Sequence, residues 1–175
     1  IPVTAVPGAA ACVTALTISG LPTRRFAFEA FLPTEKKERQ QILEELKQET
    51  RTIVLYEAPH RLVKTLRLLL ETLGDRQVRG CRELTKKHET VYEDTLSGAV
   101  SYYEEQEPKG ECVLVIAGKS REEIRREEQM QWEEMTLEEH MEKYLSEGMD
   151  RKEAMKQVAK DRGIGKREVY RALLQ

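Results

Sequence analysis

Two unbroken apolar segments of strand length constrain this chain more than any other feature. They are Thr52–Tyr56, which reads Thr-Ile-Val-Leu-Tyr, and Cys112–Ile116, which reads Cys-Val-Leu-Val-Ile. Runs of this kind, without polar alternation, are typical of strands that are covered on both faces of a sheet. A helix is predicted between them, because leucines recur at helical spacing from Leu62 to Leu73 after Pro59 and stop at Gly74. Buried strands separated by an amphipathic helix indicate an α/β fold.

The remaining segments before residue 118 extend this pattern. A helix is predicted from Pro7-Gly8 to Ser19, a strand around Phe26–Phe31, and a polar helix capped by Thr34 that runs to Gln48. Two strands, Gln77–Leu84 and Glu89–Leu96, are predicted around a charged turn, followed by a short helix to about Gln106. We therefore predict one α/β domain over residues 1–118, with a mixed five- or six-stranded sheet and helices on both faces.

The last third of the chain differs in composition. Residues 119–135 are predicted to form a charged, helical connector. Residues 136–175 are predicted to form a small all-α unit that resembles a helix-turn-helix, with a tight turn at Gly163-Ile164-Gly165. The segment from Asp150 to Gln175 holds eight basic and four acidic residues, although the whole chain has a net charge of −2. A polyanion is therefore expected to meet this tail first.

Several classes of protein are disfavoured by the sequence. The three cysteines lie far apart in apolar surroundings and the three histidines are scattered, so no metal site is predicted. No apolar stretch reaches about 18 residues, and we predict a cytoplasmic protein without a membrane segment. The chain begins with Ile1 inside an apolar run, Ile1–Val6, so we expect a further domain before it.

Five segments, in order and at natural spacing, carry a resemblance to a known family. They are Val3–Ala11 leading to Ile18–Phe26, then Phe31-Leu32-Pro33, Tyr56–Arg61, Arg82–Glu89 and Pro108–Glu111. Together they resemble the second domain of the tetrapyrrole (corrin/porphyrin) methylases, in the branch that modifies ribosomal RNA. The family often has proline and serine where this chain has Ala9 and Ala10, so a hydroxyl contact is missing at that position.

The resemblance implies a cofactor and the residues that bind it. Members of the family bind S-adenosylmethionine (SAM) in a cleft between two domains, and ligands of α/β sheets lie beyond the carboxyl ends of strands. By position, the cofactor-binding residues implied for this chain are Ala10, Ala11, Tyr56, Glu57, Leu84, Lys109 and Gly110.

The resemblance also implies a reaction, 2′-O-methylation of a cytidine ribose in small-subunit (16S) rRNA, with the small (30S) ribosomal subunit as partner and a homodimer as the assembly. The hydroxyl must lose a proton, and the candidate catalytic bases are Glu57, Glu83 and His88. Side chains that can bind RNA phosphates are His60, Arg61, Arg82, Lys86, Lys87, Lys166, Arg167 and Arg171. Because half of the pocket is expected elsewhere, this chain alone is expected to be inactive.

Two other functions remain open on the sequence. A methylase of a corrin or porphyrin precursor shares the fold, but has no need of the Pro59-His60-Arg61 segment, the Arg82–Glu89 segment or the basic tail. A DNA-binding regulator explains the helix-turn-helix, but not the family segments of the first 118 residues. His60 and Arg61 also fit a plain helix cap with a surface ion pair, and Arg82–His88 fits a solvated hairpin.

Overall fold

The computed structural model describes residues 1–106, 108–133 and 135–173, and the side chains of all of these except residues 128, 131 and 133. Residue 134 of the predicted connector and residues 174–175 of the predicted tail lie outside the described part. The chain forms two compact units, Ile1–Lys119 and Ser120–Gln175.

A five-stranded mixed sheet forms the centre of the first unit. Its strands are β1 (Phe26–Phe31), β2 (Thr52–Glu57), β3 (Gln77–Arg82), β4 (Thr90–Thr95) and β5 (Cys112–Ile116). They lie in the order β1-β2-β5-β3-β4, and only β1 and β2 are parallel neighbours. The two apolar runs of the sequence, β2 and β5, pair in the middle of the sheet. The predicted mixed sheet is confirmed, with five strands rather than six.

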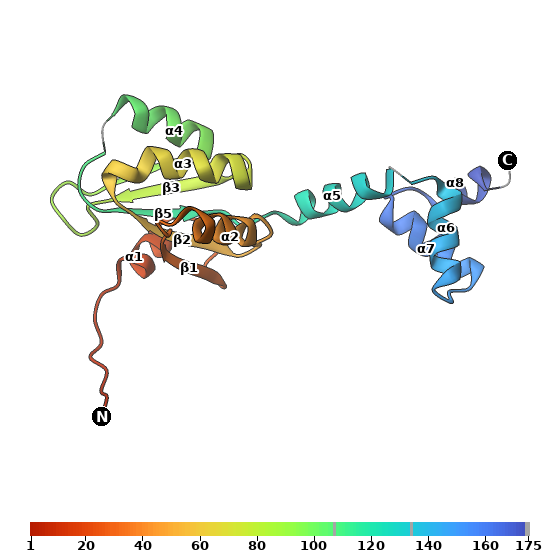
Figure 1. Cartoon of the computed structure of the whole chain (residues 1–175), viewed down its shortest axis with the longest axis horizontal. Helices are drawn as coiled ribbons and strands as arrows, with labels where there is room; N and C mark the ends of the chain where they lie inside the picture. The colour runs from red at the N-terminus through yellow and green to blue at the C-terminus, as the bar shows by residue number, and fades with distance from the viewer. Residues whose placement is uncertain (107, 134, 174–175) are drawn as a thin grey trace. The chain divides into compact units, whose positions relative to one another are not determined.

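Helices cover both faces of the sheet, but unequally (Figure 1). On one face α2 (Lys36–Lys47), α3 (Pro59–Leu73) and α4 (Leu96–Glu105) bury Ile53, Leu55, Leu114 and Ile116. On the other face the short helix α1 (Ala11–Ile18) packs on Val54, Val113 and Val115. Side chains of successive strand residues point to opposite faces, so the same strands supply both cores. Because α1 is short, Phe28 and Phe31 of β1 remain exposed.

Two helix starts differ from the sequence prediction. Helix α1 begins at Ala11 rather than near Pro7-Gly8, and its first turn is held by Tyr56, whose hydroxyl accepts a hydrogen bond from Cys12 N at 3.0 Å. Helix α2 is capped by Glu35 rather than Thr34, because the Glu35 carboxylate accepts from Glu38 N at 2.7 Å. The carbonyl of Thr34 accepts from Arg39 instead.

The second unit contains α5 (Arg121–Glu133), α6 (Leu137–Ser146), α7 (Arg151–Asp161) and α8 (Lys166–Ala172). Thr136 and Glu139 form a capping box at the start of α6, and Asp150 caps α7. Helices α6, α7 and α8 share a core of Met141, Ala154, Val158, Ala159 and Val169. His140 is buried, stacks on Trp132 with ring centroids 4.0 Å apart, and accepts from Arg162 Nε. Burial, followed by the charge of Arg162, lowers its pKa.

Candidate functional site

The register of the strands brings the family segments to one edge of the sheet. Glu57 at the end of β2 pairs with Cys112 at the start of β5, and Cys112 pairs with Arg82 at the end of β3. Arg82 in turn pairs with Thr90 at the start of β4. The carboxyl ends of β1, β2 and β3 therefore meet the amino ends of β4 and β5. The Tyr56–Arg61, Arg82–Glu89 and Pro108–Glu111 segments all lie at this edge.

Predicted cofactor residues gather beside α1. Cys12, Tyr56 and Leu84 pack against the same small core on the α1 face of the sheet. The hydrogen bond from Cys12 N to the Tyr56 hydroxyl joins the helix start to the end of β2, and burial raises the pKa of that hydroxyl. Ala10 occupies the N-cap position with an extended backbone and supplies no side-chain cap. The edge thus offers an apolar surface next to a helix start whose N-cap residue, Ala10, leaves backbone N–H groups without a side-chain cap of its own.

A second group of predicted residues lines one open cavity of about 630 Å³ at the same edge. It lies between the β3–β4 loop and the segment that leads into β5. Its lining residues are Arg82, Glu83, Lys87, His88, Glu89, Thr90, Lys109 and Gly110. Lys87 and Lys109, which are more than twenty positions apart in the sequence, therefore line the same cavity. Arg82 Nε is buried without a hydrogen-bond partner among the described residues.

Glu83 organises the loop that bounds this cavity. Its Oε1 accepts from Glu111 N at 3.0 Å and lies 3.3 Å from Lys86 Nζ. The hydrogen bond from the Glu111 backbone, followed by Lys86, holds the pKa of this carboxyl below its usual value. Gly110 permits the approach, because its φ is +77° and a Cβ there would overlap the Glu83 carboxylate. A carboxylate bound in this way is suited to fixing the loop.

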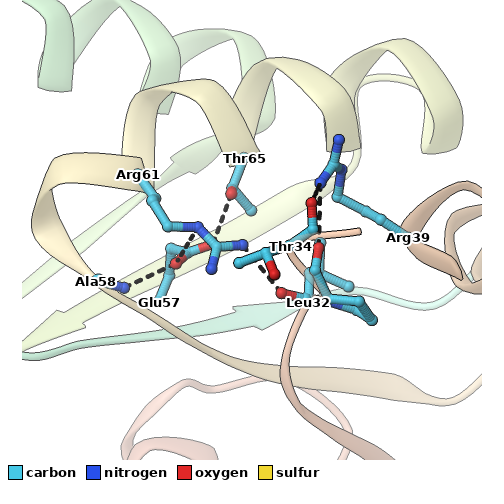
Figure 2. A network of polar contacts seen from close by, with 8 residues as sticks. Leu32, Thr34, Arg39, Glu57, Ala58, Arg61 and Thr65 are labelled. Carbon is cyan, nitrogen blue, oxygen red and sulfur yellow. Dashed lines mark hydrogen bonds and ion pairs between the residues drawn. The ribbon is translucent and has the colours of Figure 1, made fainter. Parts of the chain in front are cut away.

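Glu57 lies on the opposite face of the sheet from Tyr56. It belongs to a buried polar network (Figure 2). One oxygen accepts from Thr65 Oγ1 at 2.5 Å, and the other accepts from Ala58 N at 2.8 Å and lies 3.4 Å from Arg61 Nε. The Glu57 side chain has no exposed surface. Because an enclosed, fully bonded carboxylate has no open path to a substrate proton, Glu57 is better explained as the anchor of this network. Its catalytic and cofactor-binding roles stay predictions without support from this geometry.

Among the three predicted bases, His88 has the most accessible position. It is exposed, lines the 630 Å³ cavity and has no hydrogen-bond partner among the described residues. Glu83 is held by Glu111 and Lys86, and Glu57 is enclosed. The geometry therefore favours His88 as the group that can accept a proton in this cavity.

The predicted RNA-binding residues divide between the two units. In the first unit His60 is exposed, Arg61 is held by Glu57 and the Leu32 carbonyl, and Lys86 pairs with Glu83 and Glu111. In the second unit an open cavity of about 560 Å³ is lined by Lys166, Arg167, Tyr170 and Arg171, among other residues. Tyr170 is exposed.

The sequence reasoning overlooked two further cations, Arg39 and Lys64, which share a pocket with Arg61. Arg61 and Lys64 are three residues apart on a predicted helix and therefore lie on one face. Lys64 could thus have been predicted from the sequence as a neighbour of Arg61. No such signal existed for Arg39, which reaches the pocket from another helix.

Comparison with known proteins decides the family. The model of the family described as Tetrapyrrole (Corrin/Porphyrin) Methylases matches residues 1–100, more than half of the chain. The chain belongs to the tetrapyrrole methylases. The resemblance inferred from the sequence segments is thereby confirmed.

Two curated relatives of this tetrapyrrole methylase chain carry the same name, Ribosomal RNA small subunit methyltransferase I. The protein of Bacillus subtilis (strain 168) is 47% identical over 166 residues, which are 95% of this chain and 56% of the relative. The protein of Synechocystis sp. is 43% identical over 171 residues, 97% of this chain and 60% of the relative. The chain therefore spans just over half the length of these relatives.

A solved structure described as the methyltransferase CobJ shares the fold. It aligns with a TM-score of 0.52 at 16% identity, over 64% of this chain and 49% of that chain. In the described part of this tetrapyrrole methylase chain, no helix is long and apolar enough to cross a membrane. The same residues contain no group of three or more His, Cys, Asp or Glu side chains that fits a metal ion.

Proposed function

We propose that the intact protein is a SAM-dependent methyltransferase that methylates the 2′-hydroxyl of a cytidine ribose in small-subunit rRNA. The observation that carries this proposal is the 47% identity, over 95% of the chain, to a relative named Ribosomal RNA small subunit methyltransferase I. The geometry agrees with it, since the family segments converge on one sheet edge with an open cavity that is lined by charged residues of both signs.

The residues at this edge fit the chemical parts of SAM. The apolar surface of Cys12, Tyr56 and Leu84 on the α1 face suits an adenine ring, and Lys109 at the same edge suits a carboxylate. The unbonded, buried Arg82 Nε is a donor that a ligand can satisfy. SAM, when bound, supplies a methyl group on a positively charged sulfur. This chain's own part is to position the acceptor hydroxyl and to accept its proton, for which we propose His88.

The reaction balances without a metal or an oxidant. Residues at this sheet edge, among them Tyr56, Leu84 and Lys109, would hold SAM, which would supply the methyl group to the ribose oxygen with a neutral thioether as the leaving group. The hydroxyl proton passes to a base, which contributes about 10²–10⁴-fold, while alignment of donor and acceptor contributes on the order of 7–11 kcal/mol at best.

We further propose that a domain outside this chain completes the pocket, that the intact protein is a cytoplasmic homodimer, and that its substrate is the 30S subunit. Support for a completing domain comes from the relatives, of which this chain covers only 56% and 60%. A site open on one side buries too little of a ligand for tight binding. The chain alone is therefore expected to transfer no methyl groups.

The test is a tritiated methyl-transfer assay with the full-length protein and small subunits from a strain that lacks the enzyme, followed by nuclease mapping of the label. We expect label on one 2′-O-methylated cytidine, and a loss of about 10²-fold or more with His88→Gln. The control Lys37→Gln changes an exposed residue of α2 that does not line the 630 Å³ cavity and has no predicted part in RNA binding. Absence of RNA label, with transfer to a corrin or porphyrin precursor instead, would overturn the proposed substrate.

A further inference from the structure

A small cationic pocket lies between the β1–α2 loop and α3, on the face of the sheet that α1 does not cover. Its volume is about 180 Å³, and it is lined by Thr34, Arg39, Arg61, Lys64, Thr65 and Leu68. At about 30 Å³ of liquid volume per water, this space holds several waters or one tetrahedral oxyanion with part of its hydration. Three lining residues are cations and none is a carboxylate.

Two of the cations are held in place by the main chain (Figure 2). Arg39 Nη1 donates to the carbonyls of Pro33 and Thr34 at 3.1 and 2.9 Å. Arg61 Nη2 donates to the carbonyl of Leu32 at 2.9 Å. A carbonyl orients a guanidinium without neutralising its charge, and each guanidinium has five N–H donors, so donors remain for a ligand. Three consecutive residues of one loop thus fix two guanidinium groups beside one cavity.

The charges near the pocket do not cancel. Glu57 lies behind it and pairs with Arg61 at 3.4 Å. Lys64 is exposed and has no hydrogen-bond or ion-pair partner among the described residues, and the described part shows no ion pair of Arg39 within 4 Å. Exposed Glu35 caps α2 and does not line the pocket; hydrogen bonds from the α2 backbone are the first cause of its lowered pKa, and the charge of Arg39 is a smaller one. Arg39, Arg61 and Lys64 against Glu57 leave a surplus of two positive charges.

The pocket also lies at the edge of the sheet where the candidate site is found. Thr34 follows the end of β1, and Arg61 lies in the first turns of α3 after the end of β2. We propose that this pocket binds an oxyanion of the phosphate class, and that in the intact protein the phosphate belongs to the backbone of the RNA substrate. The assignment of the phosphate to RNA rests on the proposed function, whereas the binding of an oxyanion does not.

The pocket itself is tested with inorganic phosphate and this 175-residue chain. Amide NMR shifts during a phosphate titration at constant ionic strength should change at Thr34, Lys64 and Thr65. Lys64→Gln should weaken phosphate binding about three- to tenfold, because it removes one charged donor. Lys37→Gln is the matched control, since Lys37 is an exposed lysine of the neighbouring helix that does not line the pocket. Equal affinities in the two variants, or no shifts in the wild type, would overturn the anion site.

The source of the phosphate is tested with the full-length protein and a single-stranded RNA oligonucleotide. A plot of log affinity against log salt concentration has a negative slope, which should become shallower by about 0.7 for each RNA phosphate that the protein no longer neutralises. Lys64→Gln should therefore flatten the slope by about that amount, and Lys37→Gln should leave it as it is. If Lys64→Gln leaves the slope unchanged while the pocket binds inorganic phosphate, the pocket binds a free phosphate compound. The proposal that the phosphate belongs to RNA is then overturned. If the wild-type protein transfers no methyl groups to RNA, the proposed function is contradicted. The result of the phosphate titration, which tests the anion site alone, still holds.

Discussion

At the scale of single residues, neighbours in the sequence have separate tasks because strand geometry turns them to opposite faces. Tyr56 faces α1 and bonds its first turn, whereas Glu57 faces α3 and bonds Thr65 and Arg61. Gly110 and Glu83 lie far apart in the sequence but act together. The Glu83 carboxylate can accept from Glu111 N only because Gly110 has no Cβ in its way.

Replacing the buried carboxylate should reveal its structural task. Glu57→Gln removes the charge that Arg61 faces while it keeps the size of the side chain, and we expect the free energy of unfolding to fall by about 1.5–3 kcal/mol. Glu44→Gln, which breaks an exposed pair with Lys47, should change it by less than about 0.5 kcal/mol. Urea unfolding of both variants is the measurement. Equal losses would contradict the structural role.

The close approach at Gly110 can be separated from backbone strain. Gly110 and Gly74 both have φ of +77°, but a Cβ at Gly74 meets nothing within 4 Å. Gly74→Ala should therefore cost only backbone strain, about 1–3 kcal/mol, because its φ of 77° and ψ of −174° lie in a region that is almost restricted to glycine, whereas Gly110→Ala should cost more and displace Glu83. Unfolding measurements on the pair give the difference. If the two losses match, Gly110 is not required for the approach of Glu83.

At the scale of elements, a local turn joins α2 to β2 and carries its own charge pair. Glu49 accepts from Arg51 N at 2.7 Å and from Arg51 Nη2 at 2.5 Å, and its backbone carbonyl accepts from Lys119 N. The side-chain hydrogen bond from Arg51 is the main cause that lowers the pKa of Glu49 to about 2. This turn therefore depends on an ionised carboxylate.

The pH dependence of stability follows from that pKa. Because the folded pKa lies below the unfolded value of about 4.5, the unfolded state binds the proton first, and the stabilisation is complete above pH 4.5 and lost as pH falls toward 2. Since Arg51 is 41% exposed, we expect a contribution of only about 1–2 kcal/mol. Glu49→Gln should flatten the stability profile between pH 2 and 4.5. A profile with the wild-type slope in that window would refute this account.

At the scale of the whole molecule, the chain divides into two units with separate hydrophobic cores. Units that share no core are expected to unfold independently. Calorimetry of the full chain should show two transitions, and a chain of residues 1–119 should retain the one that belongs to the α/β unit. Coincident unfolding by all probes would show that the units are thermodynamically coupled.

The sequence by itself determined the elements and the family. Hydrophobic periodicity, Pro59 and Gly74 mark α3, and the unbroken runs mark β2 and β5, because these signals depend on neighbouring residues alone. The ordered family segments also needed no structure, and the match over residues 1–100 confirms them. Local information failed where a distant group set the boundary, as Tyr56 does for the start of α1.

The tertiary structure alone decided which of the marked residues act together. The pairing of Glu57 with Cys112 and of Cys112 with Arg82 depends on strand register, which links residues 55 and 30 positions apart. The same long-range geometry encloses Glu57, leaves His88 open and brings Arg39 to Arg61. Burial and charge compensation are properties of such assembled surroundings. They arise only when the sheet pairs and the helices pack on it, so no local pattern specifies them.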